Sequence, residues 1–455
     1  MTVRLAGAAV ALFLALVPVA EAGPLADTCR RVNDVLHGPC RGGEQVVRLA
    51  TDLTGLPRAG VREFTGSWTH RSLVFQHRLA GDVPLRDAPW LGTHNSYNAV
   101  AEVGPALSTV DANHVLTMYE QLELGVRSLE IDVHWFPALL EGAARKPVVC
   151  HGRGADQAHF GCTLERSLDP VLRGIRRWLD EHPGEVLLLY VEDHLEGEAG
   201  YAAAAAAIEG RLGDVLWRPP SGGAACDELP LDLTRDEVAA AGKQVIVVSD
   251  CGAGAAWRAI AFDWSSHVET RPRGFRDFPD CGPDFERADY DGGIVRYFED
   301  STALTATLAG LGQERADDGI RPATAAAMLR CGVDLLGLDQ LVPDDPRLPA
   351  LVWSWAPGEP AGEGACAIQR ADGRWEARPC EEAHRIACRD GGGWVVTETA
   401  APAAEAGERC AAAGATHDAP RTGHENARLR AAAGDAIVWL GIRRDRGGWA
   451  PVVRR

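Results

Sequence analysis

Lysine is almost absent from this sequence. Only Lys146 and Lys243 occur among its 455 residues, and the formal net charge is −18. Nucleic acids and anionic bilayers attract proteins through clustered basic side chains, so this composition argues against both as electrostatic partners. We therefore expect no nucleic-acid partner, and arginine carries nearly all of the positive charge.

Long apolar runs are also absent beyond the N-terminus. No later segment reaches the ~18 consecutive apolar residues that a membrane-spanning helix needs, so no transmembrane anchor is expected. The N-terminus itself has Arg4, an apolar stretch over 6–20 and the small-x-small sequence AEA that ends at Ala22. This pattern predicts a signal peptide over 1–22, cleaved near Ala22, and a secreted, extracellular protein.

The twelve cysteines include no pair with CxxC spacing, which argues against a zinc site. An even number of cysteines in an exported chain favours disulfides instead. The local pairs Cys29–Cys40 and Cys150–Cys162 are the best candidates in the first part of the chain. The sequence leaves four other cysteines unassigned, namely Cys226, Cys251, Cys281 and Cys331.

Short apolar runs alternate with helical stretches between about 86 and 345, after an N-terminal lead over 23–85. The runs predicted as strands are 90–94, 126–134, 147–151, 185–192, 244–249, 293–298 and 333–338. The segment 167–182 has the apolar spacing of an amphipathic helix, and the alanine-rich segment 201–212 is a second helix by propensity. Repeated units of this size predict an α/β fold with a parallel sheet, and their number favours a (β/α)₈ TIM-like barrel.

Two histidines, three carboxylates and one amide lie at or near the ends of the first four predicted strands: His94, Asn95, Glu130, Asp132, His151 and Glu192. Catalytic residues of such barrels lie at the C-terminal ends of strands. Oxygen ligands for a hard cation, together with histidines for proton transfer, are the groups that phosphoryl transfer needs. Taken singly, each motif is more often a turn, a solvated edge or a structural histidine. Their agreement in order and position favours one site.

Four segments resemble the catalytic X region of phosphoinositide-specific phospholipases C, above all the calcium-dependent, secreted bacterial branch. They are THNSY at 93–97, EQLELGVRSLEIDVHW at 120–135, the histidine after the third strand, and VED at 191–193. The resemblance covers 86–345 and is most specific over 90–194. It implies a distorted TIM barrel with Ca²⁺ at its mouth. It also implies that His94 and His151 are catalytic, and that the metal ligands are Asn95, Glu130, Asp132 and Glu192.

The activity that this resemblance implies is cleavage of phosphatidylinositol at a membrane surface, giving diacylglycerol and an inositol (cyclic) phosphate. Calcium would assist attack of the inositol 2-hydroxyl on phosphorus, with His94 or a nearby carboxylate as base and His151 protonating the leaving group. Arg153 and Arg296 are candidate substrate contacts, although a surface ion pair is an equally common role for arginine. Because clustered lysine is missing, unphosphorylated phosphatidylinositol is the favoured substrate. Asp339 could face the mouth, but the sequence assigns it no catalytic role.

Residues 346–455 differ in composition and are predicted to form a second domain. WSWAPGEP at 353–360 and VWLGI at 438–442 resemble the two halves of a small α+β C-type lectin-like domain, in the reversed order of a circular permutation. That resemblance implies the disulfides Cys366–Cys380 and Cys388–Cys410. The motif EPN of sugar-binding members is replaced by EPA at 359–361. The domain is therefore a scaffold or a module for a glycan or protein ligand.

Two alternatives to a phosphatidylinositol phosphodiesterase remain open. The same barrel could act on a glycerophosphodiester or a sphingolipid, neither of which yields a cyclic inositol phosphate. The chain could also be a secreted, non-enzymatic binding protein on an inactive barrel. A decayed site should have lost at least one of the six polar residues, and all six are present.

Overall fold

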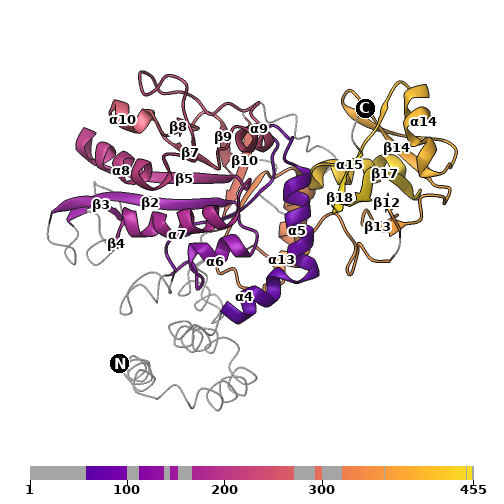
Figure 1. Ribbon diagram of the computed structural model, residues 1–455, viewed down its shortest axis with the longest axis horizontal. Coiled ribbons are helices and arrows are strands. Elements are labelled where there is room, and N and C mark those ends of the chain that lie inside the picture. Colours follow the sequence, from indigo (N-terminus) through magenta and orange to yellow (C-terminus); the bar gives the residue numbers. More distant parts are fainter. Residues whose placement is uncertain are drawn as a thin grey trace, which may run out of the picture.

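The computed structural model describes residues 58–99, 112–137, 144–151, 166–270, 293–299, 320–362, 364–446 and 448–452. The predicted signal peptide, Arg153 and the cysteines at 29, 40, 162 and 281 lie outside these ranges. No helix within them is long and apolar enough to cross a membrane. A large unit built on a parallel sheet and a smaller C-terminal unit lie on either side of helix α5 (Trp68–Leu79), as Figure 1 shows.

The large unit is a curled sheet with the strand order β9-β10-β11-β1-β2-β5-β7, and β6 and β8 both pair with β7. Every neighbouring pair in this series is parallel. No pairing among the described residues joins β8 to β9, so the sheet curls like a barrel but stays open there. The strands are β1 (Trp90–Thr93), β2 (Ser128–Pro137), β5 (Leu187–His194), β6 (Leu216–Trp217), β7 (Val245–Ser249), β8 (Phe262–Asp263), β9 (Val268–Thr270), β10 (Ile294–Phe298) and β11 (Leu335–Leu338).

This architecture confirms the predicted α/β TIM-like barrel. Each of the seven predicted runs overlaps a strand, and the two predicted helices correspond to α7 (Leu168–Glu181) and α8 (Gly197–Leu212). The apolar positions expected on α7 are buried, as its periodicity requires. The other helices of this unit are α4 (Arg58–Thr65), α6 (Met118–Glu123), α9 (Arg235–Ala240), α10 (Ala255–Arg258), α12 (Pro322–Cys331) and α13 (Arg347–Ala350).

Alternation along β5 separates two apolar cores. Leu187 and Leu189 belong to the core that also contains the buried face of α7, whereas Leu188 packs with Trp90 and Ile246 on the inner side of the curl. Side chains two residues apart on a strand lie on the same face. Glu192 therefore continues the inner face at the C-terminal end of this strand.

One predicted barrel strand has a different role. The run 147–151 contributes to β3 (Arg145–Val149), which is antiparallel to β2 and places Val149 opposite Val133. The parallel pairing of β2 with β5 ends at His134, so the last residues of β2 extend beyond the barrel, and β3 covers them. A further short strand, β4 (Arg166–Ser167), pairs with β3. The expectation of a parallel barrel strand at 147–151 is therefore wrong.

The C-terminal unit is α+β, with a sheet in the order β13-β12-β17-β14-β15 and two further strands at its sides. It contains the disulfides Cys366–Cys380 and Cys388–Cys410, which confirms both implied pairings. A third disulfide, Cys226–Cys251, joins two of the unassigned cysteines in the large unit. The elements are β12 (Cys366–Gln369), β13 (Trp375–Arg378), β14 (Arg385–Asp390), β15 (Gly393–Val396), α14 (Ala406–Ala412), β16 (Thr416–His417), α15 (Gly423–Ala433), β17 (Val438–Asp445) and β18 (Gly448–Pro451).

Helix α5 joins the two units through one buried amide. The Gln76 side-chain oxygen accepts hydrogen bonds from the backbone N–H groups of Trp353 and Ser354, at 2.8 and 3.0 Å, and from the Ser354 hydroxyl. Its nitrogen donates to the carbonyl oxygen of Leu351 at 3.2 Å. Leu79, one turn further along α5, belongs to the core of the C-terminal unit. The chain leaving the barrel is thus fixed to the helix that precedes it.

We predict that Gln76→Met lowers the free energy of unfolding by about 2–4 kcal/mol, because buried donors around residue 353 lose their acceptor. Chemical denaturation monitored by tryptophan fluorescence measures the loss. Arg78→Ala is the matched control on the same helix, since that side chain is 72% exposed, and it should cost less than about 0.5 kcal/mol. Equal losses in the two variants would contradict the role of Gln76.

Candidate active site

The turn after β1 brings His94 and Asn95 to the C-terminal end of the sheet. Asn95 has a left-handed backbone with φ of 47°, which asparagine tolerates better than most residues. Its backbone N–H donates to Oε2 of Glu130 at 3.1 Å. Ser96 is bound to Glu130 in both directions, because each backbone N–H finds an acceptor on the other residue at 2.9 Å. The turn is therefore attached to β2 at the position of the predicted ligand.

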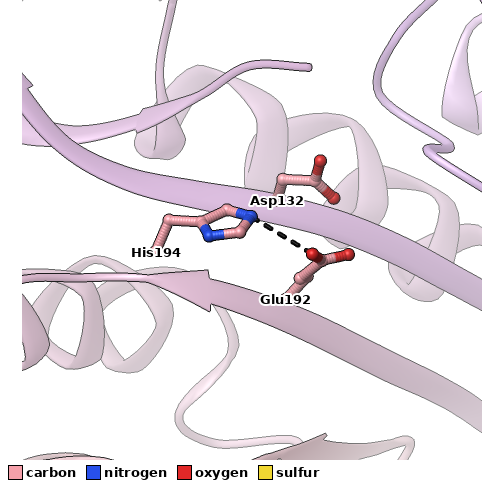
Figure 2. A group of neighbouring side chains, drawn as sticks. All are labelled: Asp132, Glu192 and His194. Carbon is pink, nitrogen blue, oxygen red and sulfur yellow. Dashed lines mark ion pairs between the residues drawn. The ribbon is translucent and has the colours of Figure 1, made fainter. Parts of the chain in front are cut away.

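Strands β2 and β5 present matching polar side chains at the same edge. Asp132 is the register partner of Glu192, and His134 is the partner of His194. Figure 2 shows Asp132, Glu192 and His194 converging from these two strands, with an ion pair of 3.2 Å between Nε2 of His194 and Oε1 of Glu192. One ligand atom from each of the three side chains lies within 4.8 Å of the others. The structure thus brings two of the three predicted carboxylates, Asp132 and Glu192, into one group with His194, which the sequence analysis did not single out, and Glu130 is not part of this group.

Two of these carboxylates are almost fully buried, since Glu130 is 2% exposed and Asp132 is 4% exposed. Burial raises the pKa of Glu130 to about 7. Burial also raises the pKa of Asp132, and the neighbouring carboxylates of Glu192 and Glu130 add to the effect. The pKa of Glu192 is lowered instead, because its carboxylate is hydrogen-bonded to His194. Crowded negative charge of this kind favours a bound cation.

The side-chain amide of Asn95 lies against the Asp132 carboxylate and can take either of two orientations there. Its hydrogen-bonding partners favour an orientation in which the nitrogen donates to both carboxylate oxygens of Asp132, each at 3.0 Å. The Tyr97 hydroxyl donates to the same carboxylate at 2.9 Å. A cation bound to Asp132 would favour the opposite orientation, because an amide oxygen can be a metal ligand and an NH₂ group cannot. Asn95 can therefore donate hydrogen bonds to Asp132 when no metal is bound, and could offer its amide oxygen to a metal when one is.

His94 lies between two acidic groups. Its Nε2 atom is 3.8 Å from Oε2 of Glu130, and its Nδ1 atom is 3.5 Å from Oδ2 of Asp339. Burial alone would lower the pKa of His94, but attraction to Glu130 and Asp339 raises it to about 10. The Phe298 ring lies 5.6 Å from the imidazole and covers one side of it. His94 is therefore a cation at neutral pH when the carboxylates are not otherwise neutralised.

Asp339 is a site residue to which the sequence analysis assigned no role. It directly follows β11, the neighbour of β1 in the sheet, so its position at a strand end was the available signal. The Asn113 side-chain nitrogen donates to Oδ2 of Asp339 at 3.0 Å. Nε2 of His114 is 3.7 Å from Oδ1 of Asp339 and 2.6 Å from the carbonyl oxygen of His94. Burial lowers the pKa of His114 to about 4, so this imidazole is neutral and donates from Nε2.

A buried ion pair holds the backbone of Asp339. Oε2 of Glu299 accepts the Asp339 N–H at 2.6 Å and a guanidinium N–H of Arg347 at 2.6 Å. Arg347 also donates to the carbonyl oxygen of Asp339 at 2.5 Å and to the Asp345 carboxylate. Burial raises the pKa of Glu299 to about 7. These contacts fix Asp339 behind His94 from the end of β10 and the start of α13.

His151 lies two residues beyond the end of β3, the strand that pairs with the extended part of β2. The backbone N–H of Cys150, the residue before it, donates to the carbonyl oxygen of Asp132 at 3.4 Å. The preceding sheet pair, Val133 with Val149, fixes the register of this pairing. The second predicted catalytic histidine therefore directly follows Cys150, which is bonded to β2. It comes from a hairpin and not from a strand of the parallel barrel.

Of the two arginines predicted to contact substrate, Arg153 and Arg296, the structure describes only Arg296. Arg153 lies outside the described residues. The Arg296 guanidinium lies about 5 Å from three aromatic ring centroids, at 4.8 to 5.1 Å. Its charge contributes to the pKa values of Glu130 and Glu192, which places it near the carboxylates. The three rings are those of Tyr190, Trp264 and Phe298.

Residues 46–345 match the family model described as the Rv2075c PI-PLC-like domain. The chain belongs to this family. It is 40% identical over 438 residues to two proteins of Mycobacterium tuberculosis, "Uncharacterized protein Rv2075c" of strain H37Rv and "Uncharacterized protein MT2135" of strain CDC 1551. The match spans 92% of this chain and 88% of each relative, so it extends into the C-terminal unit.

Several solved phospholipases C are similar at low identity. A phosphatidylinositol-specific phospholipase C from Staphylococcus aureus gives a TM-score of 0.43 at 12% identity, covering 63% of this chain and 98% of that enzyme. The corresponding enzyme from Listeria monocytogenes gives 0.40 at 14% identity, with coverages of 60% and 95%. A calcium-dependent phosphoinositol-specific phospholipase C from Pseudomonas sp. gives 0.32 at 13%, with coverages of 60% and 93%. These superpositions establish no residue correspondence.

We predict that Asp339→Asn lowers the pKa of His94 by about one unit or more, because a carboxylate at this distance favours the imidazolium. Nuclear magnetic resonance titration of the His94 ring protons measures the shift. Asp193→Asn is the matched control, since Asp193 bonds Ser249 and Tyr201 and makes no contact with His94. An unchanged His94 pKa in Asp339→Asn would show that Glu130 alone holds the charge.

Proposed function

We propose that this protein is a secreted, calcium-assisted phosphodiesterase that cleaves phosphatidylinositol to diacylglycerol and a cyclic inositol phosphate. One observation carries the proposal: buried carboxylates and an acid-paired histidine occupy one mouth of a PI-PLC-like barrel. A phosphodiester is an anion with poor leaving groups, so its cleavage needs neutralisation of charge and controlled proton transfer. This mouth has groups for both.

The donor set fits calcium. Asn95, Glu130, Asp132 and Glu192 offer an amide oxygen and three carboxylates, the ligand types that this ion prefers. Burial raises the pKa values of Glu130 and Asp132, and repulsion between neighbouring carboxylates adds to the effect; a divalent cation would relieve both. When bound, calcium supplies charge neutralisation for phosphate oxygens and acidification of the attacking hydroxyl.

His94 has two functions that depend on the charge around it. While Glu130 and Asp339 face it unscreened, its pKa of about 10 keeps it protonated, and it donates to a phosphate oxygen. Neutralisation of Glu130 removes much of that attraction and moves the pKa of His94 down, toward the range of a general base. Asp339 orients the imidazole in both states through Nδ1. His94 is thus the residue that takes the proton of the inositol 2-hydroxyl.

His151 is the general acid of the proposal. The residue before it, Cys150, is hydrogen-bonded to Asp132 of β2, the strand that carries two of the proposed metal ligands. Departure of diacylglycerol leaves an alkoxide, which is a strong base and needs a proton as it forms. A protonated imidazole can donate that proton and regain one from water in the next step.

The head group would meet Arg296 and the aromatic rings around it. A guanidinium held by aromatic faces attracts a single phosphate or several hydroxyls without a further lysine cluster. With only two lysines in the chain, the polyphosphorylated inositides lack their usual partners. We therefore propose phosphatidylinositol itself as the substrate.

The C-terminal unit would be a C-type lectin-like module that serves as a scaffold or binds a glycan or protein. Its two disulfides and its mixed sheet with two helices support this assignment. The amide that follows proline in sugar-binding members is absent, since Ala361 stands there. A sugar site that depends on calcium is thus not part of the proposal.

The first test is activity on phosphatidylinositol vesicles with calcium or a chelator, with phosphorus nuclear magnetic resonance identifying the product. We expect a cyclic inositol phosphate with calcium and a loss of at least ~100-fold in rate with the chelator, because charge neutralisation contributes several kcal/mol. Full activity in the presence of the chelator would refute the proposed requirement for a metal ion. Turnover of only glycerophosphodiesters or sphingolipids would favour the alternative substrates, and inactivity on all three would favour a binding protein.

The second test is His151→Ala. Loss of a general acid should lower kcat by about 10²–10⁴-fold while calcium affinity, measured by calorimetry, stays within about threefold of the parent protein. A nitrophenyl ester of inositol phosphate has a leaving group that needs no proton, so the loss on this substrate should be much smaller. His384→Ala, in the C-terminal unit, is the control. An equal loss on both substrates would contradict the acid role.

A further inference from the structure

His194 lies beside the carboxylates and has no place in the proposed reaction. It follows Glu192 by two residues on β5, so both side chains lie on the same face of the sheet. Figure 2 shows the imidazole directed toward the Glu192 carboxylate, with Asp132 on the adjacent strand. His194 is therefore an edge residue of the same cluster and not part of a separate one.

The separations within this cluster suit ligands of one ion. Metal–ligand bonds of about 2.1–2.4 Å place neighbouring ligand atoms about 3 Å apart and opposite ones less than about 5 Å apart. The pair of Nε2 in His194 and Oε1 in Glu192 is 3.2 Å apart, and all three ligand atoms fall within 4.8 Å. The side chains of His194 and Glu192 are 22% and 42% exposed, so an ion can reach them from solvent.

We infer that His194 is a further ligand of the proposed metal site, and that its nitrogen makes the site bind first-row divalent transition ions more tightly than Ca²⁺. The inference rests on the proposed function only for the existence of a metal site. Calcium prefers oxygen ligands, whereas imidazole is a good ligand for Mn²⁺, Co²⁺ and Zn²⁺. Asp132 and Glu192 serve either kind of ion, so residue 194 sets the preference between them.

A purely structural role for His194 makes a different prediction. In that role the imidazole only holds Glu192 in place and packs at a tilt against His134, whose ring centroid is 4.3 Å away. Its loss would then misplace Glu192 and weaken the binding of every cation to the same degree. A ligand role confines the loss to ions that accept nitrogen. Comparing ions in one variant separates the two roles.

The experiment is a calorimetric titration of the full-length protein with Ca²⁺, Mn²⁺ and Co²⁺, with electron paramagnetic resonance as a second measure of Mn²⁺. His194→Gln should weaken Mn²⁺ and Co²⁺ binding by about 10- to 100-fold and change Ca²⁺ affinity by less than about threefold. His194→Asp replaces nitrogen by oxygen and should reverse the preference toward Ca²⁺. His267→Gln is the control, because it breaks a His–Glu pair of 3.3 Å outside the site.

The possible results separate the ligand role of His194 from the calcium-assisted activity proposed above. Equal weakening of all three ions, or no weakening of any, overturns the ligand role of His194 and leaves the calcium-assisted activity standing. Failure of the parent protein to bind any of the ions overturns the metal site and this inference together. A visible absorption spectrum of bound Co²⁺ that changes in His194→Gln but not in His267→Gln supports direct coordination by nitrogen.

Discussion

Burial of the Glu130 and Asp132 carboxylates is the constraint around which the barrel mouth is built. Removing such charges from water is costly unless each oxygen has a donor and positive charge lies near. The turn after β1 meets this need with the Asn95 N–H, the Tyr97 hydroxyl and the His94 imidazole. His94 therefore helps to neutralise the resting site and is also the residue that we propose acts on a substrate, so stability and reactivity share this contact.

Local patterns were sufficient for much of the fold. Six of the seven apolar runs became strands of the parallel sheet because their length and apolar composition suit a buried sheet, and the period of 168–179 became the buried face of α7. The carboxylates of β2 could be placed on one face because a strand repeats every two residues. Their proximity to Glu192 also followed from parallel order, since strand ends meet at one edge. The disulfides of the C-terminal unit came from a resemblance and not from spacing.

Contacts between distant segments were beyond the reach of those patterns. Asp339 reaches His94 because β11 lies next to β1, a pairing of residues about 245 positions apart that no local signal encodes. The run at 147–151 has the composition of a barrel strand, but the excess length of β2 captures it as an antiparallel partner. His194 stands in an apolar strand beside an acidic pair and resembles a core histidine until the register with β2 is known.

Helix α5 gives this molecule a fixed geometry between its two units. Gln76 bonds the chain that leaves the barrel, while Leu79 of the same helix is part of the other core. There is no slack tether between the units at this point. A ligand bound to the C-terminal unit would accordingly have a fixed orientation relative to the barrel mouth. The two units would then move over a surface together, and their relative orientation would be the one established on folding.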